Sequence, residues 1–150
     1  MEARPEDVES IDGVIRAMYE VISGPAGPRD WERERTLFAP GARLMPTRPG
    51  QDGPPIIDVF DLDGYIASRS PYFAGNDFYE IEVARRVDRF GNIAHAWSTY
   101  ESRRALDEPP FMRGINSIQF FHDGQRWWVT SITWDNERTG NPIPKAISAP

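Results

Sequence analysis

The chain has 150 residues, of which 39% are apolar and 27% are charged, a composition typical of one globular domain. Its 23 acidic and 17 basic side chains give a net charge of -6, which argues against nucleic acid as a partner. The chain has no cysteine and only two histidines, which excludes disulfides and thiolate chemistry and argues against a metal site.

The first helices are predicted from residues 5–28. The sequence Pro-Glu-Asp at 5–7 suits the first turn of a helix, where acidic side chains meet the positive end of the helix dipole. Apolar residues then recur at helical spacing as far as Ile22, and glycines and prolines at 24–28 end the helix. Asp30 is a good cap for a second, short helix.

The next segment predicts shorter elements and a third helix. These are a short strand over 42–45, a proline- and glycine-rich loop over 46–55, an edge strand over 56–60, and a helix that Asp61 or Asp63 caps and that extends through Tyr72.

From Tyr79 onward the period changes to that of strands. Apolar residues alternate with Glu80, Glu82 and Arg86, which predicts a half-buried strand with one wet face. Turn sequences then separate three further long strands, expected over 93–103, 111–122 and 125–136, with Asp123-Gly124 typical of a type I′ hairpin. The second half therefore predicts a four-stranded antiparallel meander.

The last two predicted strands are apolar on both faces. Trp128, Ile132 and Trp134 alternate with Trp127 and Val129. One face can pack on the helices, and the other needs a different cover because large exposed apolar patches are uncommon on monomers. We expect a second copy of the sheet to provide it in a twofold homodimer. The tail over 137–150 has little to pack against and is expected to be an extended arm.

Two runs of sequence resemble the NTF2-like superfamily, and most of all its SnoaL-like and ketosteroid-isomerase-like branches. The first is 36–44, where such proteins pass from a helix to the first strand; the second is 120–134, a hairpin with a tryptophan just after its turn. The resemblance covers about residues 8–136 of a single domain, 1–150. It implies an α+β fold, a cone in which N-terminal helices pack on a curved antiparallel sheet that encloses a pocket. The fold alone does not imply a function.

The resemblance also has departures. Ketosteroid isomerases carry a carboxylate base at the end of the first strand, where this chain reads Leu44-Met45-Pro46-Thr47 without an acid. Dehydratases of this fold use histidines on strands together with tyrosines. His95 lies in the middle of a predicted strand and could match one of them, whereas His122 adjoins a hairpin turn.

The candidate catalytic residue is therefore His95, whose imidazole could act as a general base near neutral pH. It shares a strand face with Trp97 and Thr99, and a register one residue away would place Ser98 and Tyr100 in the pocket instead. The plainer interpretation, which we favour, puts His95 on the dimer face. The candidate ligand-binding residues are Met18, Tyr19, Met45, Tyr65, Tyr72, Trp97, Asn116 and Trp134.

Three functions are compatible with these patterns. The first is a protein that binds a small apolar or aromatic molecule without chemistry. The second is a cofactor-free lyase or isomerase, of dehydratase or cyclase type, that uses His95 with a tyrosine. The third is a dimeric interaction module without a ligand. The sequence has no phosphate-binding glycine loop, nucleophile elbow or metal motif, and no run of roughly 20 apolar residues that could span a membrane. Its acidic N-terminus lacks the apolar core of a signal peptide. We therefore expect a cytoplasmic protein with no cofactor and no membrane partner.

Overall fold

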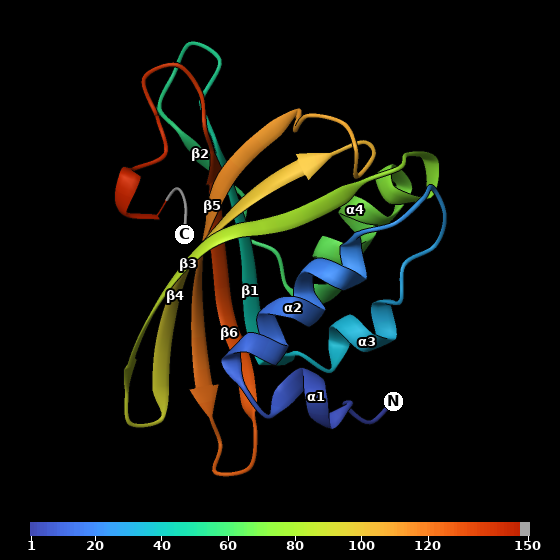
Figure 1. Cartoon of the computed structure of the whole chain (residues 1–150), viewed down its shortest axis with the longest axis vertical. Helices are drawn as coiled ribbons and strands as arrows, with labels where there is room; N and C mark the ends of the chain where they lie inside the picture. Colours follow the sequence, from blue (N-terminus) through green and yellow to red (C-terminus); the bar gives the residue numbers. More distant parts are fainter. Residues whose placement is uncertain (148–150) are drawn as a thin grey trace.

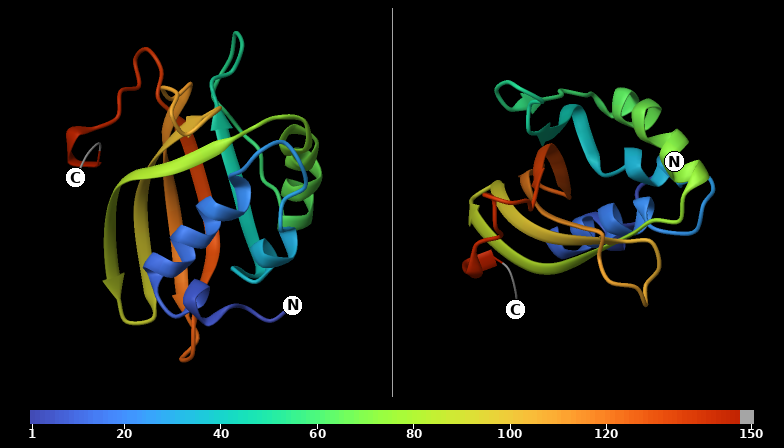
Figure 2. Two further views of the ribbon diagram at one scale, coloured as in Figure 1. Left: turned by 45° about the vertical axis from the view of Figure 1, so that its right-hand side comes forward. Right: turned by 90° about the horizontal axis from the view of Figure 1, so that it is seen from above.

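The structure is a computed structural model that describes residues 1–147. Its α-helices lie on one side of a curved, open six-stranded sheet, which gives the α+β architecture expected from the sequence (Figures 1 and 2). The elements are α1 (Pro5–Val8), α2 (Ile11–Ile22), α3 (Trp31–Arg35), β1 (Phe38–Arg48), β2 (Ile56–Ile57), α4 (Leu62–Gly75), β3 (Tyr79–Phe90), β4 (Ile93–Arg103), β5 (Met112–His122), β6 (Trp127–Asn136) and η1 (Lys145–Ile147).

The segment predicted as a single first helix forms two helices in the structure, α1 and α2. The chain leaves helical geometry at Ser10, whose hydroxyl accepts a hydrogen bond from Gly13 N at 3.0 Å and so caps α2. A side chain at position 13 would collide with the carbonyl of Glu6, so glycine is what allows α1 to pack this closely on α2. Both contribute to the core through buried residues, among them Val8, Val14 and Ile15.

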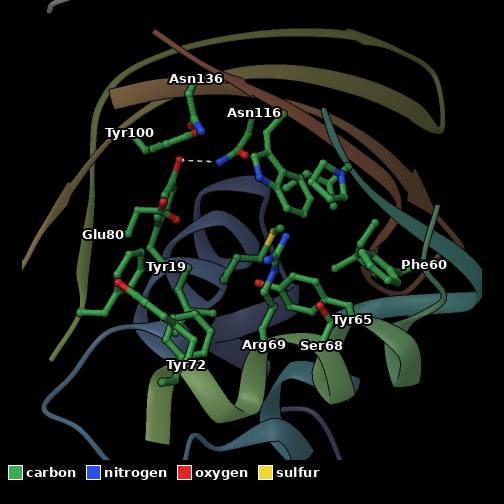
Figure 3. Close-up of a pocket in the computed structure, with 18 of the residues that line it drawn as sticks. Tyr19, Phe60, Tyr65, Ser68, Arg69, Tyr72, Glu80, Tyr100, Asn116 and Asn136 are labelled. Carbon is green, nitrogen blue, oxygen red and sulfur yellow. Dashed lines mark hydrogen bonds between the residues drawn. The ribbon is translucent and has the colours of Figure 1, made fainter. Parts of the chain in front are cut away.

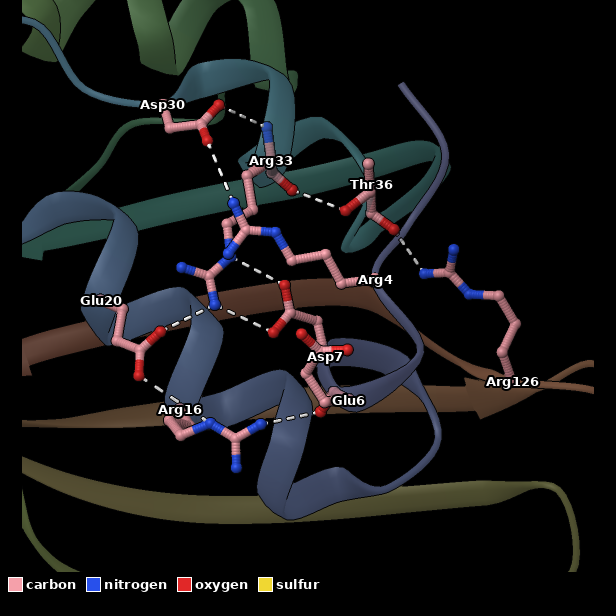
Figure 4. A network of polar contacts seen from close by, with 9 residues as sticks. All are labelled: Arg4, Glu6, Asp7, Arg16, Glu20, Asp30, Arg33, Thr36 and Arg126. Carbon is pink, nitrogen blue, oxygen red and sulfur yellow. Dashed lines mark hydrogen bonds and ion pairs between the residues drawn. The ribbon is translucent and has the colours of Figure 1, made fainter.

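A buried ion pair fastens α3 to the first two helices (Figure 4). Arg33 donates to both carboxylate oxygens of Asp7, at 2.7 and 2.9 Å, and to Glu20 at 2.7 Å. Asp7 is fully buried, and its bonds to Arg33 lower the pKa of its carboxyl despite that burial. The three helical segments are thereby held as one layer against the sheet.

The predicted caps of the later helices are confirmed. Asp30 accepts a hydrogen bond from Arg33 N at 3.0 Å at the start of α3, and Asp61, one of the two candidates, accepts one from Gly64 N at 2.7 Å at the start of α4. The predicted edge strand is only two residues long, with one further bridge between Phe60 and Leu44.

The sheet order is β2-β1-β6-β5-β4-β3. The predicted meander of β3, β4, β5 and β6 is confirmed and is antiparallel throughout. In contrast, β1 pairs in parallel with β6 and is much longer than the expected strand over 42–45, so the sheet is mixed. This pairing joins residues about 90 positions apart, which local periodicity does not encode.

Two β-bulges change which side chains face the helices. Val83 is an extra residue opposite the β4 pair Thr99 and Tyr100, and Thr130 is an extra residue between the pairs Gln119–Ser131 and Phe120–Val129. Each bulge shifts the alternation of a strand by one residue. The expectation that Trp128 shares a face with Ile132 and Trp134 is therefore wrong, because Thr130 intervenes.

The tail does not extend away from the domain, contrary to expectation. It turns at a bridge between Arg138 and Asn141, and η1 packs against β3 and β4 on the side opposite the helices (Figure 1). There the Thr99 hydroxyl donates a hydrogen bond to the carbonyl of Ile147, and Thr99 is fully buried. The last part of the predicted arm, 148–150, lies outside the described residues.

Candidate functional site

A cavity of about 680 Å³ lies between the helices and the concave face of the sheet (Figure 3). Helices α2, α3 and α4 and strands β1, β3, β4, β5 and β6 all contribute to its walls. Most of its lining is apolar or aromatic, with Met18, Phe60, Ile118, Ile132 and Trp134 among the residues that form it. Such a lining with a few convergent polar groups is typical of a site for a small molecule.

Tyr19 is at the centre of one polar cluster in the cavity wall. Its hydroxyl lies 2.7 Å from the Ser98 hydroxyl and accepts a hydrogen bond from Asn116 Nδ2 at 3.1 Å. Ser98 in turn donates to the carboxylate of Glu82. Burial and the neighbouring acid Glu80 raise the pKa of Tyr19 well above its usual value, so the phenol keeps its proton.

Tyr100 adds a second phenol to the same end of the cavity. Its hydroxyl donates a hydrogen bond to Asn136 Oδ1 and lies directly over Gly114, where any side chain would collide with it. Tyr100 can therefore occupy this position only because residue 114 is a glycine. Burial, with nearby Glu80, raises the pKa of this phenol as well.

Glu80 is an acid in the cavity wall, although its alternation with apolar residues predicted a wet face. It pairs with Ser102 across β3 and β4, and the Ser102 hydroxyl donates to its carboxylate at 3.1 Å. Burial raises the pKa of Glu80 to about 7, against the opposing effect of the Ser102 hydrogen bond. A carboxyl that titrates near neutral pH beside two phenols can accept and return a proton.

Glu34 is a second acid in the cavity wall, and no sequence pattern predicted it there. It lies on α3, is 3% exposed and lines the cavity, and its Oε2 atom has no hydrogen-bond partner within the described residues 1–147. Burial raises its pKa to about 8, despite the opposing charge of Arg33. In the sequence it lies within the charged run 32–35, which resembles a solvated helix face.

Six of the predicted ligand-binding residues line the cavity, namely Met18, Tyr19, Tyr65, Tyr72, Asn116 and Trp134. Met45 does not, because its neighbours Leu44 and Pro46 take the inward positions on β1. Trp97 does not either, since β4 directs Ser98 and Tyr100 toward the cavity.

His95 also lies outside the cavity. Its Nε2 atom is 2.9 Å from the Ser117 hydroxyl on β5, and its ring meets Trp97 edge-on at 4.9 Å. Burial lowers the pKa of the imidazole. The correct register is thus the one-residue alternative, and the hypothesis that His95 acts on a ligand in this cavity is wrong in its geometry.

Within residues 1–147 there is no group of three or more histidine, aspartate or glutamate side chains able to hold a metal ion. No helix of the described chain is both long and apolar enough to cross a membrane.

Neither the family models nor the curated proteins include a match to this chain. Solved structures do match. An NTF2-like protein of unknown function from Pseudomonas putida KT2440 has a TM-score of 0.64 at 13% identity, over 93% of this chain and 89% of that one. The chain has an NTF2-like fold.

Two further structures have the same NTF2-like fold. One, from Silicibacter pomeroyi DSS-3, is also described as of unknown function and has a TM-score of 0.57 at 17% identity, over 85% of this chain and 92% of that one. The other is the yeast Ubp3-associated protein Bre5, with a TM-score of 0.60 at 9% identity, over 84% of this chain and 92% of that one. At these identities the likeness concerns the fold.

Proposed function

We propose that this NTF2-like protein binds a small, largely apolar or aromatic molecule in the cone cavity. The observation that carries the proposal is the cavity itself, about 680 Å³ and lined mainly by apolar and aromatic side chains. The polar groups gather at defined places in the wall, such as Tyr19 with Asn116, where they can orient a ligand.

Native mass spectrometry of the purified protein tests this proposal. We expect a bound small molecule that organic extraction releases and identifies. Met18→Trp, which places a larger side chain in the cavity, should abolish the bound mass, whereas Met45→Trp, outside the cavity, should retain it. A bound mass that survives Met18→Trp would place the ligand elsewhere and contradict the proposal.

A second candidate is a cofactor-free lyase or isomerase, and one observation favours it. Glu80 has a pKa near 7 and lies close enough to Tyr19 and Tyr100 to raise the pKa of both phenols. In this version Glu80, and not His95, is the general base, and a tyrosine hydroxyl stabilises the developing oxyanion.

Deuterium exchange into a ketone with acidic α-hydrogens, such as 2-tetralone in D₂O, tests the second candidate by NMR. Exchange catalysed by the wild type should be lost in Glu80→Gln and retained in His95→Ala, because Glu80 lines the cavity and His95 does not. Equal rates in the presence and absence of protein would leave binding without chemistry as the function.

We also propose that the protein forms a homodimer through the outer face of the sheet. Phe90, Ile93 and Phe121 are 84%, 59% and 42% exposed, and Ile93 pairs directly with Phe121 across β4 and β5. Apolar exposure of this kind favours a partner. Sedimentation at micromolar concentration should give a dimer that Phe121→Asp dissociates, and a monomeric wild type would contradict this.

An interaction module without a ligand remains a third candidate. One structural neighbour, yeast Bre5, occurs in a complex described as that of the deubiquitinase Ubp3 with its cofactor Bre5. A cytoplasmic location and the lack of nucleic-acid partners stay predictions from composition and charge.

A further inference from the structure

Helix α4 presents one continuous face to the cavity. Counted from Tyr65, three further residues follow at positions +3, +4 and +7, namely Ser68, Arg69 and Tyr72. This spacing places all four on one side of the helix, and all four line the cavity. Figure 3 shows them along the same wall, with Glu80 and Asn116 at another. Each of the four side chains ends in a hydrogen-bond donor, and none is a carboxylate.

Arg69 differs from the other arginines of the chain. It alone among the arginines of residues 1–147 makes neither a hydrogen bond nor an ion pair with the protein. The other arginine in the cavity wall, Arg48, forms an ion pair with Asp58, which also lines the wall, so their charges cancel. Arg69 is therefore the one uncompensated cation of the cavity within the described chain.

Two side chains on the same face of α4 as Arg69 also end in donors. The hydroxyls of Tyr65 and Ser68 make no hydrogen bond to any described residue, although Tyr65 is 8% exposed. Burial raises the pKa of Tyr65, as do the nearby acids Glu34 and Glu80, while Arg69 is close enough to oppose them in part. A guanidinium and two free hydroxyls on one helix face are complementary to an oxygen anion.

The other charges in the cavity allow an anion to enter. Glu34 and Glu80 both line it, and burial raises the pKa of each, to about 8 and about 7, so both hold protons in mildly acidic solution. Neither forms an ion pair with Arg69. The cavity then offers a single uncompensated positive charge in a lining that is mainly aromatic and aliphatic.

We propose that the ligand of this cavity is an apolar or aromatic monocarboxylate whose carboxylate group binds Arg69, with Tyr65 and Ser68 as additional donors. The planar guanidinium fork matches a carboxylate with two parallel hydrogen bonds, and one free cation balances one negative charge. The apolar body of the ligand then lies against Met18, Phe60 and Trp134. This inference rests on the proposed function and names the class of ligand.

Isothermal titration calorimetry with two probes of the same shape, 2-naphthoate and 2-naphthamide, tests it at pH 6. Wild type should bind 2-naphthoate roughly tenfold or more tightly than the amide, since a charge-assisted pair exceeds a neutral hydrogen bond by about that factor. Arg69→Gln should remove this preference and leave amide binding unchanged. Arg69→Lys, which keeps the charge without the fork, should retain part of it.

Arg86→Gln is the matched control, because it removes the same charge from an exposed position of β3 and should behave as wild type. Equal affinity of wild type for the two probes, or an undiminished preference in Arg69→Gln, would overturn the assignment while amide binding still supports the proposed function. Failure of both probes to bind wild type would contradict the proposed function itself. The comparison of the two probes on wild type needs no variant to fold.

Discussion

The hydroxyl of Tyr19 on α2 lies 2.7 Å from the hydroxyl of Ser98 on β4. Asn116 on β5 donates to the same phenol oxygen, so one buried atom joins the longest N-terminal helix to two neighbouring strands. All three residues are buried, at most 9% exposed. Since buried polar groups need partners, this contact fixes the height of α2 above the sheet.

Tyr19→Phe should therefore destabilise the protein by roughly 1–3 kcal/mol, because it leaves the Asn116 amide buried without its acceptor. Urea denaturation followed by tryptophan fluorescence measures the change. Tyr72→Phe is the control, since the Tyr72 hydroxyl has only a 3.5 Å contact with Arg104, and a change within about 0.5 kcal/mol is expected. Similar losses of stability in the two variants would show that the hydrogen bonds of Tyr19 do not stabilise the protein more than the weak contact of Tyr72.

The Asp7–Arg33 pair gives a prediction with a defined pH dependence. Asp7→Asn should lower the free energy of unfolding by about 3 kcal/mol at pH 7, because it leaves the Arg33 guanidinium without its buried partner. The folded pKa of Asp7 is lowered, so its stabilisation is present above the usual aspartate pKa and is lost as pH falls through the folded value.

The difference in stability between wild type and Asp7→Asn should consequently shrink as the pH is lowered below the usual aspartate pKa and through the folded value. Thermal denaturation across this range measures it. Asp12→Asn, which removes a carboxylate that is 82% exposed and paired with Arg85 at the surface, should change stability by less than about 1 kcal/mol. A difference for Asp7→Asn that does not vary with pH would argue against the ion pair as its cause.

Local patterns predicted most of the elements, because caps and periodicity are encoded within a few residues. Asp30 and Asp61 begin helices where expected, and Asp123-Gly124 lies between β5 and β6. Which face of the sheet each side chain occupies was harder to predict from the sequence. The bulges at Val83 and Thr130 each displace the alternation by one residue, and no local pattern marks them.

The same limitation hid the acids of the site. Alternation placed Glu80 on a wet face, yet it lies in the cavity wall opposite Ser102. The polar residues Ser98, Tyr100 and Ser102 recur at every second position of β4, and this could have indicated a polar inner stripe with an acid across from it. Glu34 carried no such indication, because its burial depends on the packing of α3 against distant elements.

Glu34→Gln should change how stability depends on pH. The folded pKa of Glu34, about 8, exceeds the usual glutamate value, so between about 4.5 and 8 the unfolded chain releases a proton that the folded protein keeps. Wild type should lose stability as pH rises through that window. The variant lacks this titration. Its free energy of unfolding, relative to that of wild type, should therefore rise by roughly 2 kcal/mol or more between pH 5 and pH 8.5.

Denaturant titrations of both proteins at several pH values measure this change. Glu32→Gln, an exposed position on the same helix, should follow the wild-type profile. Parallel profiles for wild type and Glu34→Gln would mean that Glu34 titrates normally in the folded protein.

The proposed carboxylate site predicts that anion binding weakens as the pH rises. At pH 6 Glu34 and Glu80 are mostly neutral, and Arg69 supplies one positive charge to the cavity. At pH 9 both acids are largely ionised, so the sum over these three groups becomes negative, while the Arg48–Asp58 pair contributes nothing to it. The affinity for 2-naphthoate should then fall by roughly tenfold between pH 6 and pH 9, because two nearby like charges oppose the ligand.

Calorimetry with 2-naphthoate and 2-naphthamide across this range separates charge from packing. The amide should bind equally at all pH values. Glu80→Gln should remove the part of the decline centred near pH 7, and Glu34→Gln the part centred near pH 8, since each variant deletes one titration. A decline shared by the carboxylate and the amide would instead indicate a change in the cavity walls. A pH-independent affinity for the carboxylate would mean that these two acids do not act on the ligand bound at Arg69.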